Sequence, residues 1–193
     1  MSKWNQFPHD DTAFLYEGDA LLASWPDLHR GDCVEYPDVD WVQQTLESYP
    51  AAVPAAYDGD AGALAVMIQD AWRCFHRGDY QQATELADQC GLLAHAVANK
   101  ATGIYATYLE PAEAAQQALY LTAVTRAEAA IIALPDDPNS HYFHAFNLGR
   151  YSQSISIAKA LTQGIGGKIH TSLQQALELE PDHAEAHTAM GMY

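Results

Sequence analysis

The chain has 193 residues, a length that favours one domain or one repeat array over several domains. It carries 9 basic and 25 acidic side chains, a formal net charge of −16. A field of that sign repels phosphate backbones and anionic lipids, so we expect neither nucleic acid nor a membrane as the partner. The polar start, residues 1–6, lacks the apolar segment of a secretory signal, and the three cysteines form no Cys-x-x-Cys pair. These features predict a soluble cytoplasmic protein with reduced thiols.

The first 60 residues are the least regular part of the sequence. Asp11 and Thr12 are typical N-cap residues and predict a helix that runs to about Trp25, where Pro26 ends it. A second helix is predicted from residue 37 by apolar residues at steps of three and four, namely Val39, Val42 and Leu46. Proline, glycine and aspartate then indicate a loop over 49–60. We therefore predict an N-terminal helical segment or cap over 1–60 and a helical array over 61–193.

The second part reads as nearly continuous helix interrupted by turns. Its apolar residues are mainly alanine and leucine, which favours closely packed helices over sheets. Turn residues separate the periodic stretches at Gly78, Pro111, Pro135 and Pro181. The predicted helices cover about 61–77, 80–90, 93–109, 112–134, 141–163 and 168–179, and a last segment follows Pro181. The fold class expected is all-α.

Two stretches resemble a known family. The sequence Gly-Asp-Tyr-Gln-Gln-Ala at 78–83 is similar to the turn of a tetratricopeptide repeat, and 176–186 resembles the junction between two such repeats. Met190 and Gly191 match the large apolar residue and glycine that follow, whereas His187 stands where the family usually has tryptophan or another large residue. Residues 1–60 carry no resemblance. The resemblance implies antiparallel helical hairpins stacked as an α-solenoid, with a protein or peptide bound in a concave groove.

The sequence stops at 191–193, inside the first helix of what would be a further repeat. An unstacked repeat leaves an apolar face uncovered. We therefore expect the chain to be a fragment of a longer protein. The alternative is that a partner, or a second copy in a homo-oligomer, covers this open C-terminal edge.

Four polar residues on predicted helices are candidates for contact with a partner. They are rare cations and amides in an acidic chain, and such groups can hydrogen-bond a backbone or a carboxylate: Asn99, Lys100, Asn147 and Arg150. The alternative is that they are ordinary solvent-facing residues. No nucleophile stands in a recognisable signature, so we predict a non-catalytic scaffold without cofactor, metal or catalytic residues.

Two other functions stay open. The helices could enclose a small-molecule pocket lined by aromatic residues, namely Tyr105, Tyr108, Tyr120, Tyr142 and Tyr151. A metal-dependent enzyme could use the pairs His183/His187 and His141/His144, although no clear further ligand accompanies them. Residues 164–168 invite a phosphate-loop interpretation but lack its first glycine and the Ser or Thr after the lysine. An interhelical turn explains that stretch better.

Overall fold

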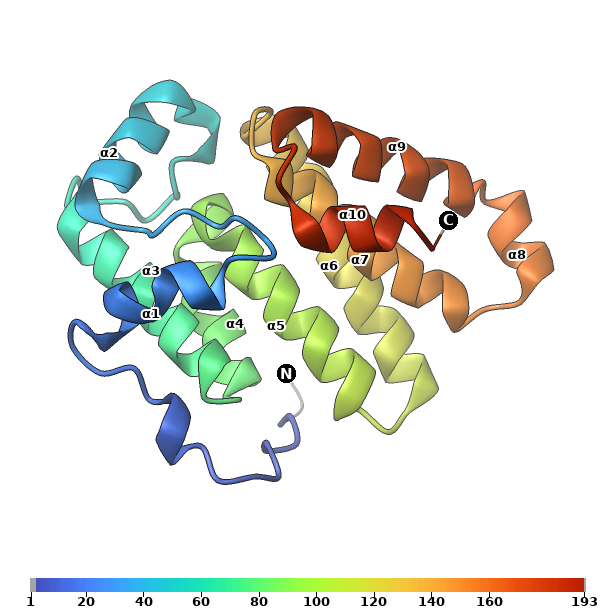
Figure 1. Ribbon diagram of the computed structural model, residues 1–193, viewed down its shortest axis with the longest axis horizontal. Coiled ribbons are helices and arrows are strands. Elements are labelled where there is room, and N and C mark those ends of the chain that lie inside the picture. The colour runs from blue at the N-terminus through green and yellow to red at the C-terminus, as the bar shows by residue number, and fades with distance from the viewer. Residues whose placement is uncertain (1–2, 193) are drawn as a thin grey trace.

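The computed structural model describes residues 3–192, and every regular element in that range is a helix (Figure 1). The α-helices are Ala20–Leu28 (α1), Val39–Ser48 (α2), Ala61–His76 (α3), Tyr80–Gln89 (α4), His95–Tyr108 (α5), Glu113–Ala133 (α6), Pro138–Gln153 (α7), Ile157–Thr162 (α8), Ile165–Leu179 (α9) and Ala184–Met190 (α10). Short 3-10 turns lie at Thr12–Phe14, Pro50–Ala52 and Gly91–Ala94. None of these helices has the length and apolar character needed to cross a membrane.

The helices pack in chain order. Helix α3 packs on α4, α4 on α5, α5 on α6, α6 on α7, α7 on α9 and α9 on α10. In addition α5 contacts both α3 and α7, so alternate helices form one layer. Helix α1 and the segment 29–38 lie across this layer, in front of α3 and α5 in Figure 1. We call the surface of α3, α5, α7 and α10 on that side the inner face.

The turn between α3 and α4 confirms the sequence-based expectation. Gly78 has a φ of 85°, a left-handed conformation that glycine adopts without steric cost. The amide of Asp79 donates to the carbonyl of Cys74 at 2.8 Å, which closes the end of α3. Ala83 and Ala87 of α4 and Cys90 at its C-cap are inaccessible to solvent, and Tyr80 at its start is partly buried. Small side chains therefore let α4 approach its neighbours closely.

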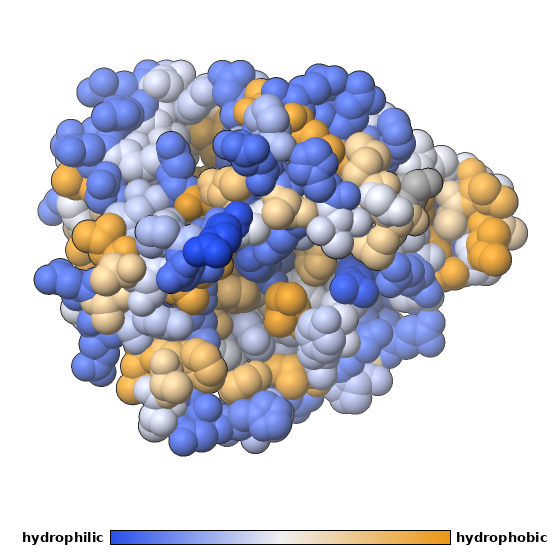
Figure 2. Space-filling view, in the orientation of Figure 1, coloured by the Kyte–Doolittle hydropathy of each residue, from blue (hydrophilic) through white to orange (hydrophobic). Residues whose placement is uncertain are grey.

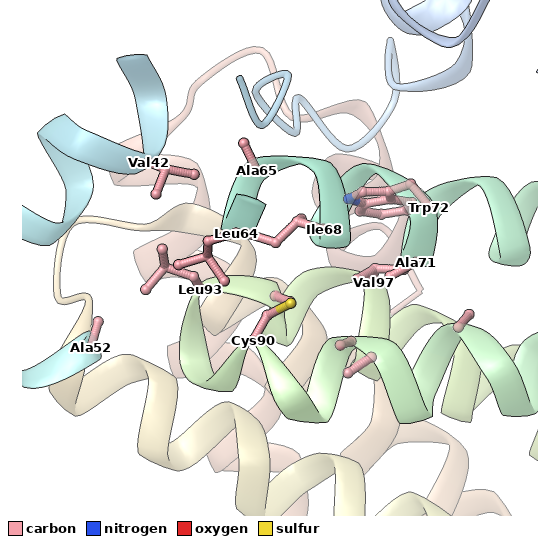
Figure 3. Close-up of a cluster of buried hydrophobic side chains, with 14 of the residues drawn as sticks. Val42, Ala52, Leu64, Ala65, Ile68, Ala71, Trp72, Cys90, Leu93 and Val97 are labelled. Carbon is pink, nitrogen blue, oxygen red and sulfur yellow. The ribbon is translucent and has the colours of Figure 1, made fainter. Parts of the chain in front are cut away.

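Two clusters of buried side chains form the core. The first joins α1, α2, α3 and α5 around Trp72 and Ile68, and it includes Leu21, Trp25 and Val42 from the first 60 residues (Figure 3). The second joins α5, α6, α7, α9 and α10; its largest inaccessible members are Phe143, Ile165, Ile169 and Leu173. Residues 20–52 thus share a core with the array that follows them.

The long helix expected over 141–163 is wrong in its extent. The structure has two helices there, α7 and the short α8, separated by residues 154–156. The hydroxyl of Ser154 donates to the carbonyl of Tyr151, and the hydroxyl of Ser156 accepts from the amide of Lys159 as the N-cap of α8. Serine side chains that bond the local backbone in this way compete with helix continuation.

The first predicted helix also differs from the structure. Only a 3-10 turn follows Asp11, and α1 begins at Ala20, because Tyr16 and Gly18 adopt positive φ angles of 44° and 55°. Pro26 does not end α1 but lies inside it. The helix continues past the proline because the amide of His29 donates to the carbonyl of Trp25 at 2.9 Å, and the Trp25 side chain is buried.

Candidate binding site

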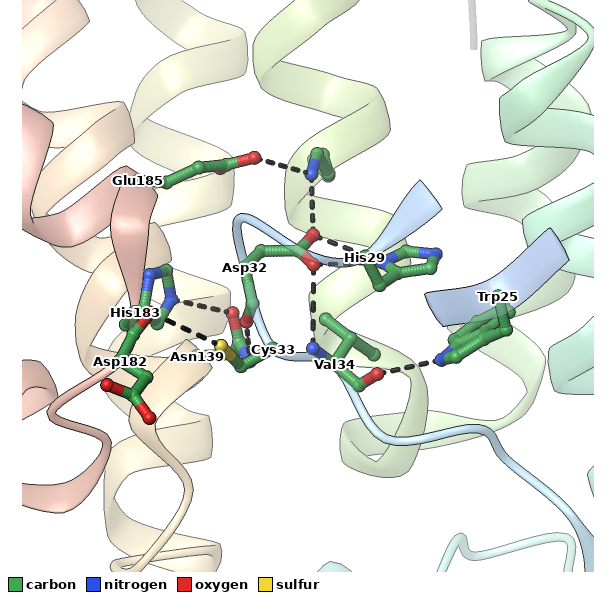
Figure 4. A network of polar contacts seen from close by, with 10 residues as sticks. Trp25, His29, Asp32, Cys33, Val34, Asn139, Asp182, His183 and Glu185 are labelled. Carbon is green, nitrogen blue, oxygen red and sulfur yellow. Dashed lines mark hydrogen bonds and ion pairs between the residues drawn. The ribbon is translucent and has the colours of Figure 1, made fainter. Parts of the chain in front are cut away.

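The inner face holds a non-helical segment of the chain itself. The carbonyl of Asp32 accepts a hydrogen bond from Asn139 Nδ2 of α7 at 2.9 Å. The carbonyl of Gly31 accepts one from the backbone amide of Glu185 in α10, also at 2.9 Å. Figure 4 shows Asp32 and its neighbours between the helices that supply these groups. Residues far away in the sequence therefore hold this segment through its backbone, which is how extended polypeptides are recognised generally.

The side chain of Asp32 is the charged centre of this contact. It has no solvent exposure, and its Oδ1 lies 2.9 Å from His29 Nδ1. Its Oδ2 accepts from Lys100 Nζ of α5, and that nitrogen also lies 3.2 Å from Glu185 Oε1. A buried carboxylate requires partners of this kind, since an unpaired charge in the interior is costly. One lysine thus connects the segment 29–38 to both α5 and α10.

The pKa of Asp32 is lowered and the pKa of Lys100 is raised, so both side chains stay ionised. Burial works to raise the pKa of Asp32, but the hydrogen bond from His29 and the positive charge of Lys100 outweigh it and lower that pKa far below its usual range. Burial works to lower the pKa of Lys100, and the carboxylates of Asp32 and Glu185 reverse this and raise it. The contact is therefore a charged pair at neutral pH.

Aromatic rings surround this pair on the side of α1 and α3. Trp25 stacks on His29 with ring centroids 3.9 Å apart, and Trp25 meets Trp72 edge-on at 5.5 Å. His76 lies one turn beyond Trp72, with ring centroids 5.8 Å apart. Burial lowers the pKa of His76 to about 3, so its imidazole is neutral. A signal for this cluster was present in the sequence, because a histidine follows a tryptophan by four residues both at 25/29 and at 72/76.

Of the four residues predicted for partner contact, two lie on the inner face and two are buried between helices. Lys100 lies on the inner face and is occupied by Asp32 and Glu185. Asn99 and Asn147 have no solvent exposure, so the alternative that they are solvent-facing residues is wrong. Arg126 Nη1 donates to Asn99 Oδ1, and Asn147 Nδ2 donates to the carbonyl of Phe143. Their amides serve helix packing in this structure.

The fourth residue, Arg150, borders an open hollow of about 400 Å³ between α7, α9 and α10. Its guanidinium lies 5.6 Å from the centre of the Phe146 ring. The floor of the hollow is formed mainly by apolar and small side chains, among them Tyr142, Ala145, Gly149, Leu173 and Ala189. Nearby, α8 exposes Ile157 and Leu161, and Figure 2 shows apolar residues at that end of the molecule. Apolar surface bordered by one cation, Arg150, and one carboxylate, Glu185, is thus accessible on this part of the molecule.

A second hollow, of about 350 Å³, lies between α2, α3, the start of α5 and the loop before α7. None of its lining residues belongs to the hollow beside Arg150. Of the five tyrosines considered for a ligand pocket, Tyr142 alone borders either hollow. Tyr105 instead stacks on Trp4, and Tyr108 is 68 % exposed on α5. The five rings do not line a common pocket.

The histidine pairs considered as metal ligands serve helix ends and side-chain contacts. His183 Nδ1 accepts from the amide of Ala186 at 3.1 Å as the N-cap of α10. His187 Nε2 lies 2.8 Å from the carbonyl of Pro181, and His144 Nδ1 lies 2.7 Å from Ser172 Oγ. Within residues 3–192, no three side chains of the metal-ligating types come together.

Comparisons with known proteins identify no relative of this chain. Protein families, curated proteins and solved structures were all searched, and none matches the chain. The resemblance to tetratricopeptide repeats therefore rests on two stretches, 78–83 and 176–186, and stays a prediction.

Proposed function

We propose that the protein is a non-catalytic helical-repeat scaffold that binds a segment of a protein or peptide partner on its inner face. The observation that carries this proposal is the segment 29–38. Its backbone carbonyls at Gly31 and Asp32 are bound by α10 and α7, and its carboxylate is bound by Lys100 of α5. These groups are occupied by the chain's own segment, and we propose that the open part of the same face receives a segment of another chain in a similar way.

A stacked, tetratricopeptide-like solenoid is part of this proposal. Support comes from the order of packing, in which each helix packs on the next and alternate helices share a layer. The left-handed Gly78 turn and the His183 cap occur at the two positions where the family resemblance places a turn and a junction. An arrangement of this kind presents one long face built from the first helix of each hairpin.

The part of the inner face proposed for the partner is the hollow beside Arg150. Its apolar floor suits aliphatic or aromatic side chains, and Arg150 can donate two hydrogen bonds to a carboxylate or a backbone carbonyl. Removal of the guanidinium should therefore weaken a bound partner without disturbing the core. In this proposal the apolar contacts supply most of the binding free energy, and the hydrogen bonds of Arg150 set the orientation of the partner.

Site-specific photocrosslinking in cells tests the location of binding. Benzoyl-phenylalanine in place of Thr188, which borders the hollow, should crosslink to a defined protein. The same group in place of Thr122, which is exposed on α6, serves as the control and should not. The crosslinked partner, once purified, should bind the Arg150→Ala variant about tenfold more weakly than the unsubstituted chain in calorimetry, because a charge-assisted hydrogen bond is lost.

Three outcomes contradict the proposal. One is equal crosslinking from both positions, and another is undiminished affinity of the Arg150→Ala variant. The third is a crosslink from position 188 to a second copy of this chain together with a dimer in sedimentation. That result would replace a partner protein by a homo-oligomer formed through α10.

A further inference from the structure

The charged side chains of this protein are distributed unevenly along the sequence. Residues 138–177 contain no aspartate or glutamate, so all 25 acidic side chains lie in the rest of the chain. The same stretch holds three of the nine basic side chains, namely Arg150, Lys159 and Lys168. A protein with a net charge of −16 therefore has one region that carries only positive charge.

Burial explains the lack of carboxylates in only part of this region. Helix α7 is largely buried, and acidic residues are rare at buried positions. Over 152–164, in contrast, no residue is buried, and the exposed polar positions hold serine, threonine, glutamine and lysine. Glu113 of α6 borders the same shallow hollow as Arg150, so the surface without carboxylates begins beyond Arg150, at α8.

Helix α8 directs apolar side chains towards solvent. Ile157 is 80 % exposed and Leu161 is 76 % exposed. They stand four residues apart, so they lie on one face of the helix and form a short apolar ridge. Ala160 and the preceding Ile155 are partly buried against the second core cluster and hold α8 to the rest of the protein. Covering the ridge by a partner would therefore be favourable.

Two lysines accompany this ridge. Lys159 lies between its two members in the sequence and is exposed. Lys168 is exposed near the start of α9, against which α8 packs (Figure 1). Neither lysine forms an ion pair in the described part of the chain, whereas five other basic side chains do, namely Arg30, Arg73, Arg77, Lys100 and Arg126. We call the ridge together with Lys159 and Lys168 the α8 surface.

We propose that the α8 surface docks an acidic amphipathic helix of a partner protein. Apolar side chains of that helix cover the ridge, and its carboxylates pair with Lys159 and Lys168. At about 0.15 M salt, charges more than about 8 Å apart are largely screened, so the local lysines rather than the net charge decide the sign of the contact. Carboxylates elsewhere on the protein repel such a helix and confine it to this surface. No residue of the α8 surface borders the hollow beside Arg150, so this inference goes beyond the function proposed above.

Two synthetic peptides that differ only in charge test the proposal on the 193-residue chain. Each has about 20 residues, enough to form a helix, with leucine at every third or fourth position and either glutamate or glutamine beside it. We expect the glutamate peptide to bind in calorimetry at about 0.15 M salt and the glutamine peptide to bind about tenfold more weakly. Lys159→Glu should weaken the glutamate peptide about tenfold, whereas Arg30→Glu, at a side chain that is 80 % exposed, should not.

A matched pair of isoleucines tests the apolar part of the contact. Ile157→Ser should weaken the glutamate peptide about tenfold, whereas Ile132→Ser on α6, where the side chain is 81 % exposed, should leave its affinity unchanged. Because both side chains are exposed, both variants should fold. Absence of binding, equal binding of the two peptides, or equal effects of the two serine substitutions would each overturn the proposal.

Two other occupants of the α8 surface would also overturn it. One is an anionic lipid surface, which would appear as binding to phosphatidylserine vesicles that Ile157→Ser abolishes. The other is a second copy of this chain, which would appear as a dimer in sedimentation that Ile157→Ser dissociates. These variants change no residue of the hollow beside Arg150, so the crosslink from position 188 can succeed or fail independently of them.

Discussion

The inner face has two parts: one is covered by the chain's own N-terminal residues, and the other is open to solvent. Over α3 and α5 it is covered by the chain itself, because Trp25 of α1 packs against Trp72 of α3 and His29, just after α1, packs against His76 of α3. Over α7 and α10 it is open, with a hollow of about 400 Å³. The difference follows from side-chain size, because the open part is built on small residues, among them Ala145, Gly149, Ala184 and Ala189. Large rings fill one half of the face, and small residues leave room in the other.

Among the substitutions considered, we expect Asp32→Asn in the covered half to cause the largest loss of unfolding free energy. This change removes the negative charge next to Lys100, whose side chain is only 15 % exposed. Loss of one partner of a buried pair costs about 3 kcal/mol of unfolding free energy. Urea denaturation measures this, and Asp27→Asn is the control, because Asp27 forms an ion pair while 79 % exposed and should change stability by under about 0.5 kcal/mol. A loss below about 1 kcal/mol for Asp32→Asn would show that the pair does not hold the segment.

The junction between the two halves should be sensitive to Gly103→Ala. A Cβ at Gly103 of α5 would lie 2.6 Å from Asn147 Oδ1 and 2.6 Å from Phe146 Cε1 of α7. Because the Asn147 side chain has no solvent exposure and is held by its hydrogen bond to the carbonyl of Phe143, its Oδ1 cannot move aside freely, and we expect a loss of about 2 kcal/mol in thermal or urea unfolding.

Gly166→Ala in α9 is the matched control for this change. No atom lies within 4 Å of the Cβ that it would add, so it should gain about 0.5 kcal/mol from helix propensity. Equal effects of the two substitutions would contradict the close approach of α5 and α7.

The smallest expected effect is on how the stability of the protein changes at acidic pH. Burial lowers the pKa of His76 to about 3. The unfolded chain therefore takes up a proton at this residue near pH 6.5 and the folded chain does not, so His76 makes stability fall as the pH drops from about 6.5 towards 3. His76→Phe should reduce the loss between pH 5.5 and 4.5 by about 1 kcal/mol, since one proton accounts for about 1.4 kcal/mol per pH unit. An unchanged slope would contradict burial of a neutral imidazole.

Much of the fold could be predicted from the sequence, because its signals are local. Gly78 needs a left-handed turn, and Asp38 precedes an apolar stripe and caps α2 by accepting from the amide of Trp41. The errors arose where tertiary packing overrides a local rule. Pro26 stays inside α1 because Trp25 is buried against α3, and the serines at 154 and 156 break a pattern that looks continuous.

The candidate sites could be predicted far less well. Lys100 and Arg150 are predicted as contact residues because cations are scarce in this chain, and the structure places both on the inner face, where their role in binding stays a prediction. Asp32 was missed, since an aspartate after a glycine reads as an exposed loop residue and only its contact with Lys100 explains its burial.

Hydrogen exchange on the 193-residue chain tests most directly whether the inner face holds a polypeptide segment through distant helices. The amide of Glu185 donates to the carbonyl of Gly31, so protection at the start of α10 depends on the segment 29–38. In Asp32→Asn we predict faster exchange in 29–38 and in 184–190 together, with exchange in α4 unchanged. Faster exchange confined to 29–38, with α10 as protected as before, would contradict recognition of this segment by the inner face.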